Sequence, residues 1–369
     1  MVILAGKISG ETSELALFNH ITIDQTNESG KNKRIESLGN LVASQAFNTK
    51  DYAQDIPKMI KVFLEQRYDG QEDIYGACFG IAAPVNNREA TIDQSGVRAT
   101  LYERDFGQQL PYKRVPVSFI NDMEAIGYGI FLGDGEKQLQ ELYHGNQESD
   151  PQERRALMLV SGGLGQALWY WDENKKRLSP ISSEGGHADF APRTEKEIAL
   201  LSYLKEKEQD KPISYEQILS SPGLIKICNF LQSTEKYDKQ NPNNAKAIIE
   251  QALQGNPLCK DALKMFISIW GAEAGNMALR YLAKGGVYIG GIPIPVEFLR
   301  EGDTFVNAFT DKEGNFKTYN EGISVKVFQE QDIVMWGAAR YAINAGFVTK
   351  GKLAIMREKQ LLGTENLND

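Results

Sequence analysis

Short apolar runs that end in glycine, proline or a polar pair recur along the first third of the chain. Val2–Ala5 and Leu15–Ile23 flank the loop Lys7–Ser13, and this spacing predicts a β-hairpin. Ile74–Ala83, which glycines interrupt and a proline ends, predicts a buried strand. Val115–Ile120 predicts another, which stops abruptly at an Asn-Asp pair. The pattern therefore predicts a sheet whose strands end in turns or polar residues.

The same plan of strand, glycine turn and strand returns in the middle of the chain. Ala156–Val160 and Gln166–Trp171 flank the glycine turn Ser161–Gly165, which suggests two halves built alike. Thr194 and Glu197 have the spacing of a capping box and predict the start of a helix. A largely helical pattern follows, and the alternation of strands with helices is typical of an α/β fold.

The length of the chain predicts two domains. Its 369 residues exceed the roughly 250–300 at which a single core stops growing. We expect a small α/β domain at residues 1–131, completed by a C-terminal helix at 334–360. A large α/β domain is expected at residues 132–333. The polar stretch at 134–155 is expected to be an exposed excursion near the domain boundary.

Composition and charge exclude several classes of function. The net charge of −8 argues against nonspecific binding of nucleic acid and against an anionic membrane surface. Nothing approaches the roughly 18 apolar residues of a membrane span. The three cysteines have neither paired nor zinc-site spacing, so buried thiols and a cytoplasmic location are expected.

Most histidines and tryptophans have structural explanations. With three histidines in the chain, a His-rich metal site is unexpected, and no metal-ligating residue is predicted. His20 and His144 are expected to be surface or loop residues. The tryptophans are expected to lie in the core rather than to form a base-stacking platform: Trp169, Trp171, Trp270 and Trp336.

Two polar groups are the candidates for chemistry. Asn121 and Asp122 place an amide and a carboxylate at the mouth of a buried strand. Glu184 and His187, separated by two glycines, offer an acceptor and a donor on one loop. Each pair alone could be a helix cap or a turn. Together with the glycine hairpins, they favour a site that binds a polyol and removes its proton.

The chain resembles the bacterial-type glucokinase family. This resemblance implies the two-domain actin-like ATPase (ribonuclease H-like) fold of sugar kinases, with the sugar in an interdomain cleft. The matching stretches follow the family order over nearly the whole chain: Ile120-Asn-Asp122, Glu184-Gly-Gly-His-Ala-Asp-Phe-Ala-Pro192, Leu219-Ser-Ser-Pro-Gly-Leu224, Gly271 to Leu279, Gly285 to Gly291 and Gly337-Ala-Ala-Arg-Tyr341.

The resemblance implies a sugar site of five residues. Asp122 matches the general base that takes the proton of the sugar 6-hydroxyl, and Asn121 matches a hydrogen-bonding amide. Glu184, His187 and Glu216 match ligands of the other hydroxyls. A positioned carboxylate helps because a primary alcohol is a poor nucleophile at neutral pH.

The same resemblance implies turns that hold ATP, with Mg²⁺ carried in by the nucleotide. Where the family has Asp-x-Gly-Gly-Thr-Asn, this chain has Lys7-Ile-Ser9-Gly10-Glu11-Thr12. The family's Gly-Thr-Gly-Leu-Gly corresponds to the turn Ser161–Gly165. The nucleotide-binding residues implied are Gly6, Gly10, Thr12, Ser161, Gly162, Gly163, Gly165, Gly290 and Gly291.

Two functions follow, from different classes. The first is a glucokinase-like sugar kinase that transfers the ATP γ-phosphoryl group to the 6-hydroxyl of glucose. The second is a non-catalytic sugar-binding sensor or regulator of the same descent, which Lys7, Ser9 and Glu11 in the first phosphate turn would favour. The hexose, the phosphoryl donor and the choice between monomer and homodimer stay open.

Overall fold

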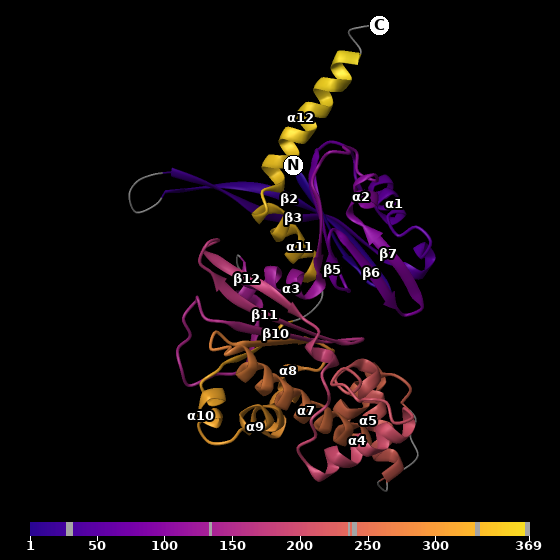
Figure 1. Cartoon of the computed structure of the whole chain (residues 1–369), viewed down its shortest axis with the longest axis vertical. Coiled ribbons are helices and arrows are strands. Elements are labelled where there is room, and N and C mark those ends of the chain that lie inside the picture. The colour runs from indigo at the N-terminus through magenta and orange to yellow at the C-terminus, as the bar shows by residue number, and fades with distance from the viewer. Residues whose placement is uncertain (27–31, 133–134, 235–236, 238–241, 329–332, 366–369) are drawn as a thin grey trace. The chain divides into compact units, whose positions relative to one another are not determined.

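Two α/β units make up the part of the chain that the structure describes. The computed structural model describes residues 1–26, 32–132, 135–234, 237, 242–328 and 333–365. The first unit is Met1–Glu136 together with Gln331–Asp369, and the second is Lys137–Glu330 (Figure 1). Each unit has a mixed sheet with helices packed on it.

A five-stranded sheet of order β3-β2-β1-β4-β8 forms the centre of the first unit. The predicted N-terminal hairpin is confirmed, because β1 pairs antiparallel with β2 and Lys7 faces Glu14. β1 and β4 run parallel, as do β4 and β8. The strands are β1 (Val2–Ile8), β2 (Thr12–Thr26), β3 (Asn32–Asn48), β4 (Ile74–Ile81) and β8 (Val117–Asn121).

Four strands of this unit have no counterpart in the sequence prediction. β3 is the edge of the main sheet, and Phe47 is the one buried residue between Glu36 and Asn48. A largely exposed strand has no long apolar run to reveal it. The others form a small antiparallel sheet: β5 (Val85–Asn86), β6 (Glu89–Gln94) and β7 (Val97–Tyr102).

The segment 334–360, expected as one helix, forms parts of two. α11 ends at Asn344 and α12 begins at Phe347, because Gly346 between them adopts a left-handed backbone with φ of +74°. α11 packs against α3, β4 and β1. The helices of this unit are η1 (Thr49–Tyr52), α1 (Lys58–Arg67), α2 (Glu103–Gly107), α3 (Asp122–Phe131), α11 (Ile333–Asn344) and α12 (Phe347–Glu365), with η2 (Gly135–Gln138) at the boundary of the units.

Replacing Gly337 with alanine is expected to destabilise the first unit by about 2 kcal/mol. Gly337 lies where α11 crosses α3, and a Cβ there would collide with the carbonyl oxygen of Ala125, a backbone atom that cannot rotate away. Urea unfolding measures the effect. Gly107→Ala is the control, since its Cβ would meet Val117 at an ordinary 3.5 Å. Equal stability of the two variants would contradict the prediction.

His20 is buried, so its predicted surface position is wrong. The two-residue period of β2 places it on the same face as buried Phe18, while Ile21 is exposed. Burial lowers the pKa of His20, and Lys352 and the amino terminus lower it further, whereas Glu36, 4.0 Å from its Nε2, opposes the shift. His144, by contrast, is exposed as expected.

This lowered pKa predicts a pH-dependent stability. The unfolded chain binds a proton at His20 near pH 6.5, whereas the folded chain binds it only at lower pH. The contribution is therefore complete above pH 6.5 and is lost as the pH falls through 6.5 toward the folded value. The slope is at most about 1.4 kcal/mol per pH unit. Urea unfolding between pH 7.5 and 5 should show a steeper loss for the wild type than for His20→Leu, and parallel curves would contradict this.

A six-stranded sheet of order β12-β11-β10-β13-β14-β9 forms the centre of the second unit. It repeats the plan of the first, with an antiparallel hairpin, β10 and β11, and a parallel neighbour, β13. The stretch 134–155 is more than an excursion, because β9 within it pairs with β14. The strands are β9 (Gln140–Tyr143), β10 (Arg155–Val160), β11 (Leu164–Asp172), β12 (Arg177–Ser183), β13 (Val287–Gly291) and β14 (Val325–Phe328).

The long helix α7 organises the core of the second unit. It packs against α5, α6, α9, β10 and β13. The predicted cap of α4 is confirmed, since Thr194 Oγ1 accepts from the amide of Glu197 at 3.2 Å. The helices are η3 (Gly185–His187), α4 (Glu195–Lys207), α5 (Ser221–Thr234), α6 (Ala245–Leu253), α7 (Pro257–Tyr281), α8 (Val296–Arg300), η4 (Glu301–Asp303), α9 (Thr304–Thr310) and α10 (Asn315–Glu321).

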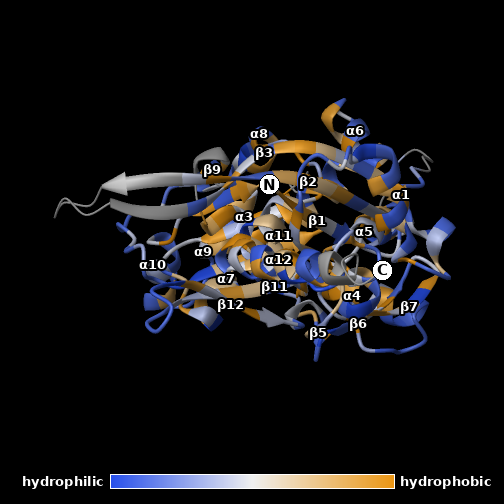
Figure 2. Ribbon diagram, turned by 90° about the horizontal axis from the view of Figure 1, so that it is seen from above, coloured by the Kyte–Doolittle hydropathy of each residue, from blue (hydrophilic) through white to orange (hydrophobic). Residues whose placement is uncertain are grey.

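The two cores are apolar, and the hydrophobic segments of their strands and helices are orange in Figure 2. Trp169 and Trp270 are fully buried, as predicted, whereas Trp171 and Trp336 are half-buried. The three cysteines are free and buried, also as predicted, and burial raises the pKa of each thiol. None of these tryptophan and cysteine side chains is exposed for binding. The candidate functional residues that remain lie in the turns and loops at the ends of the strands.

Candidate functional site

Asn121 and Asp122 stand where β8 ends and α3 begins. Asn121 is the N-cap of α3, and its Oδ1 accepts from the amide of Met123 at 2.9 Å. Asp122 Oδ1 accepts from the same amide, also at 2.9 Å. Asn121 Nδ2 donates to the carbonyl of Ala83 at 3.2 Å. The capping interpretation therefore holds, and it fixes both side chains, half-buried, at the end of the strand.

The register of the sheet brings the first glycine turn to the same edge. Ile8 at the end of β1 faces Ile81 of β4, and Ile81 faces Asn121 of β8. Neighbouring strands lie about 4.8 Å apart, so two steps separate the turn from Asn121 by about 10 Å. The sheet of the first unit therefore groups the first glycine turn with Asn121 and Asp122.

The first glycine turn is closed by its own side chains. Ser9 Oγ donates to the carbonyl of Thr12 at 2.7 Å, so the serine hydroxyl is used within the turn. Gly10 lies against the backbone of Gln94, where a Cβ would collide. Glu11 and Thr12 are exposed. Gly6, by contrast, is buried between Phe79 and Leu15 and has a packing role.

Glu184 is the N-cap of the short helix η3, and His187 is the last residue of that helix. Their side chains are 68% and 61% exposed, and His187 Nε2 lies 3.8 Å from Glu184 Oε2. Glu216 approaches the same ring from the other side, with its Oε1 3.9 Å from His187 Nδ1. Two carboxylates and an imidazole thus converge on one loop, which brings together the three residues that the family resemblance implies as ligands of sugar hydroxyls.

Backbone bonds join the loop to the segment that carries Glu216. The amide of Glu216 donates to the carbonyl of Gly186, and that of Tyr215 donates to the carbonyl of Ala188, each at 2.9 Å. Gly186 also packs against the carbonyl of Leu164, where a Cβ would collide. These bonds hold an otherwise exposed loop in place, so the position of its side chains is set by the fold.

The second glycine turn meets the same carboxylate. Glu216 Oε2 accepts from the amide of Leu164 at 3.1 Å, and a Cβ on Gly163 would lie 2.6 Å from that oxygen. Ser161 donates its amide to the carbonyl of Gly163 at 2.9 Å. Gly162 is exposed, and a Cβ there would meet nothing within 4 Å. Glu216 therefore joins the loop of Glu184 and His187 to an open turn.

The other predicted glycines of this unit differ in their surroundings. Gly165 lies in β11 opposite Leu159. Gly291 has a φ of +110° and packs against the carbonyl of Val160, at the same end of the sheet as the second turn. The ring of Phe328 fills the space beside Gly290. Packing thus explains the absence of a side chain at Gly290, whereas Gly291 lies beside the turn.

Sequence reasoning missed two polar residues behind these groups. Gln166 is fully buried and its carbonyl oxygen occupies the space that a Cβ of Gly185 would take. Glu103 is buried in the first unit, and its Oε1 accepts from the amide of Phe119 at 2.9 Å, which ties β8 down just before Asn121. Neither lies in a motif, so local sequence offered no signal for them.

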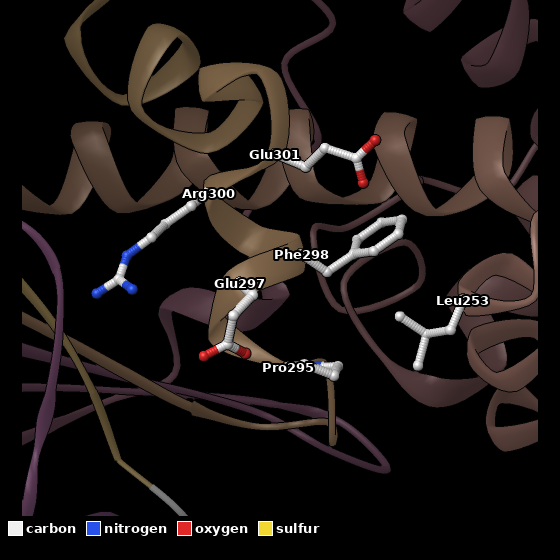
Figure 3. Close-up of a pocket in the computed structure, with 6 residues that line it drawn as sticks. All are labelled: Leu253, Pro295, Glu297, Phe298, Arg300 and Glu301. Atoms are coloured by element: carbon white, nitrogen blue, oxygen red, sulfur yellow. The ribbon is translucent and has the colours of Figure 1, made fainter.

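A pocket of about 340 Å³ in the second unit lies elsewhere (Figure 3). The ring of Phe298 points toward Leu253 across it. Two of its charged groups have other partners, since Arg300 donates to the carbonyl of Glu141 and Glu301 pairs with Lys260 at 2.8 Å. The lining residues are Leu253, Pro295, Glu297, Phe298, Arg300 and Glu301, which include none of the predicted site residues.

Within the described ranges, no cluster of three or more His, Cys, Asp and Glu side chains is arranged to hold a metal ion. In the same ranges, no helix combines the length and the apolar character needed to cross a bilayer.

The sequence is similar to known glucokinases over most of its length. The family model described as Glucokinase matches residues 25–345. A glucokinase of Nostoc sp. (strain PCC 7120) is 32% identical over 361 residues, which cover 92% of this chain and 98% of the relative.

Solved structures of glucokinases have the same fold. One from an Antarctic psychrotroph has a TM-score of 0.72 at 23% identity, covering 92% of this chain and 98% of that one. The Balamuthia mandrillaris enzyme in complex with glucose has a TM-score of 0.72 at 17% identity, covering 93% of each chain. A ROK family glucokinase from Streptomyces griseus, in complex with glucose and AMPPNP, has a TM-score of 0.57 at 17% identity, covering 92% and 99%. The predicted actin-like ATPase fold is therefore confirmed.

Proposed function

The chain belongs to the glucokinase family and is a glucokinase-like sugar kinase, and we propose that it transfers the γ-phosphoryl group of ATP to the 6-hydroxyl of glucose. The observation that carries this proposal is the position of Glu216. One oxygen of its carboxylate faces His187 on the exposed loop, and the other accepts from the amide of Leu164 in the open glycine turn. A sugar-binding group and a phosphate-binding turn are thereby joined through one side chain.

Asp122 is proposed to be the general base. A carboxylate that accepts the proton of the 6-hydroxyl, as that oxygen attacks phosphorus, raises the reactivity of a poor nucleophile. The amide of Met123 binds one carboxylate oxygen of Asp122 and orients the group. Asn121 is proposed to hydrogen-bond the sugar through the second hydrogen of Nδ2, since the first is donated to Ala83.

Glu184, His187 and Glu216 are proposed to bind the remaining hydroxyls. A polyol is selected by polar groups that would stay unpaired with the wrong stereoisomer, because unpaired polar groups are costly. The 3.8 and 3.9 Å separations on either side of the His187 ring leave these groups near one another without bonding them tightly. They can therefore exchange their mutual contacts for sugar hydroxyls.

The second glycine turn fits a nucleotide phosphate. Gly162 leaves its backbone open, so that phosphate oxygens can approach the amides of Gly162 and Gly163. The amide of Ser161 is donated to Gly163, so Ser161 is proposed to contribute its hydroxyl, and Gly165 is proposed to add a contact at the start of β11. Gly10 and Thr12 of the first turn and Gly291 are proposed to add contacts. ATP, when bound, supplies the phosphoryl group, and we propose that Mg²⁺ arrives with the nucleotide.

A coupled assay for glucose 6-phosphate with Mg·ATP tests the proposal. Product formation that saturates with glucose is expected. If no product forms under conditions in which the protein binds glucose, phosphoryl transfer is overturned. The second candidate, a sugar-binding protein without transfer, is favoured by one observation, the exposed carboxylate of Glu11 in the first phosphate turn. Isothermal titration separates the two, because only the kinase requires saturable binding of Mg·ATP as well as glucose.

Glu11→Thr is expected to lower the KM for ATP by several-fold. The carboxylate opposes a phosphate charge, and a threonine removes the repulsion and adds a hydroxyl donor. The steady-state KM for ATP and for glucose gives the answer. Glu89→Thr, which removes a charge from an exposed position of β6 in the same unit, is the matched control. Equal KM values for ATP in the two variants would place Glu11 outside the phosphate contacts.

Three broader features complete the proposal. A cytoplasmic location is proposed because the buried free thiols are typical of a reducing compartment. We propose residues 1–131 with 334–360 as the small α/β domain and 132–333 as the large one. A homodimer is the assembly to test, by light scattering at several protein concentrations.

A further inference from the structure

A buried carboxylate lies behind the sugar loop, on the long helix α7. Glu273 is completely buried, with 0% exposure. Its Oε1 accepts from Gln166 Nε2 at 2.9 Å and from the guanidinium of Arg280, and its Oε2 accepts from Asn276 Nδ2 at 3.1 Å. An ion pair with Arg280 and hydrogen bonds from two neutral amides satisfy a carboxylate that would otherwise be costly to bury.

One branch of this network reaches the loop that carries Glu184 and His187. Gln166, fully buried in β11, donates its amide to Glu273, and its carbonyl oxygen fills the space beside Gly185. Gly185 directly follows Glu184, and its own amide donates to Ser183 Oγ at 3.0 Å. The orientation of the Gln166 amide is set by which of its ends faces Glu273. Glu273 thus determines that Gly185 packs against the carbonyl oxygen of Gln166 rather than against its NH2 group.

A second branch reaches the segment that carries Glu216. Asn276 Nδ2 also donates to the hydroxyl of Tyr215 at 3.3 Å, and the amide of Tyr215 donates to Ala188 beside His187. Burial, together with the negative charge of Glu273, raises the pKa of Tyr215 to about 12, so this hydroxyl stays protonated at neutral pH. The ring of Tyr215 packs edge-on against Phe190 at 5.6 Å.

We propose that Glu273 is a positioning residue for sugar binding, which holds the Glu184–His187 loop through Gln166 and the Glu216 segment through Asn276 and Tyr215. It touches neither sugar nor nucleotide. The inference rests on the proposed function, because it assumes that Glu184, His187 and Glu216 bind glucose. Both branches end on neighbours of these three residues, so loss of the carboxylate changes sugar affinity before it changes the contacts of the phosphate turns.

Glu273→Gln tests the proposal. A glutamine keeps the shape, but only one of its two terminal atoms is an acceptor. Its NH2 group therefore faces a donor on one of the two branches, Gln166 or Asn276, and the orientation imposed there is lost. The KM and the calorimetric Kd for glucose are expected to rise about tenfold, while the KM for ATP changes less than twofold and kcat less than threefold. Asn320→Asp is the matched control, because Asn320 is equally buried against α7, yet its amide binds the carbonyls of Gly275 and Phe309 instead.

The outcomes separate the inference from the proposed function. Unchanged glucose affinity in Glu273→Gln overturns the inference, as does an equal loss for both substrates that Asn320→Asp reproduces, since that marks general loosening of the core. If Glu273→Gln does not fold, the Gln166→Leu variant is measured instead. Its Kd for glucose is expected to rise fivefold, and an unchanged Kd would overturn the inference. A wild-type protein that binds glucose without phosphorylating it overturns only the proposed transfer, and the Kd comparison still stands.

Discussion

Asp122→Asn is expected to reduce kcat for glucose phosphorylation by about 10³-fold, while the Kd for glucose changes less than threefold. The amide cannot accept the proton of the 6-hydroxyl, and a positioned general base contributes roughly 10²–10⁴-fold. The substitution preserves the fold, because Asn121 Oδ1 continues to accept from the amide of Met123 and caps α3. Initial rates in the coupled assay, with calorimetric binding of glucose, measure both quantities.

A matched carboxylate shows whether the loss is specific. Glu65→Gln removes a charge from an exposed position on α1 of the same unit, where 62% of the side chain is accessible, and should leave kcat unchanged. An Asp122→Asn variant that keeps more than a tenth of the wild-type kcat would exclude Asp122 as the base. Loss of glucose binding in proportion to the rate would give it a binding role instead.

Glu216→Ala is expected to lower kcat/KM for glucose by about 10²-fold and to raise the KM for ATP as well. The carboxylate faces His187 with one oxygen and binds the amide of Leu164 with the other, and a hydrogen bond to a charged group contributes about 1.5–3 kcal/mol. Because Leu164 belongs to the second glycine turn, its loss affects the phosphate side too. Steady-state kinetics with each substrate varied in turn measures both effects.

Glu216→Gln separates these two functions. The glutamine oxygen can still accept from Leu164, so the KM for ATP should stay within twofold of the wild type, whereas kcat/KM for glucose falls about tenfold with the charge. If both variants affect glucose alone, Glu216 does not link the turn to the sugar. If both leave glucose kinetics unchanged, Glu216 is not a sugar ligand.

The features that the sequence alone determined are those encoded over a few consecutive residues. The hairpin of β1 and β2 follows from two apolar runs around a turn, and the start of α4 follows from the spacing of Thr194 and Glu197. The family resemblance was likewise carried by short motifs, of which the loop from Glu184 to Pro192 is the most specific. Each of these signals is local, so no knowledge of the fold is needed to detect it.

The features that only the tertiary structure decided depend on residues far apart in the chain. β3 has only the short apolar run Leu41–Ala43 because it is a largely exposed edge strand, and β9 is a strand only because β14 lies beside it. Glu216 meets the amide of Leu164 across 52 positions, and Gln166 meets Glu273 across 107. A carboxylate's partner is set by packing rather than by its neighbours in sequence, which is why motifs revealed the groups that face the sugar, and the fold revealed the groups that hold them.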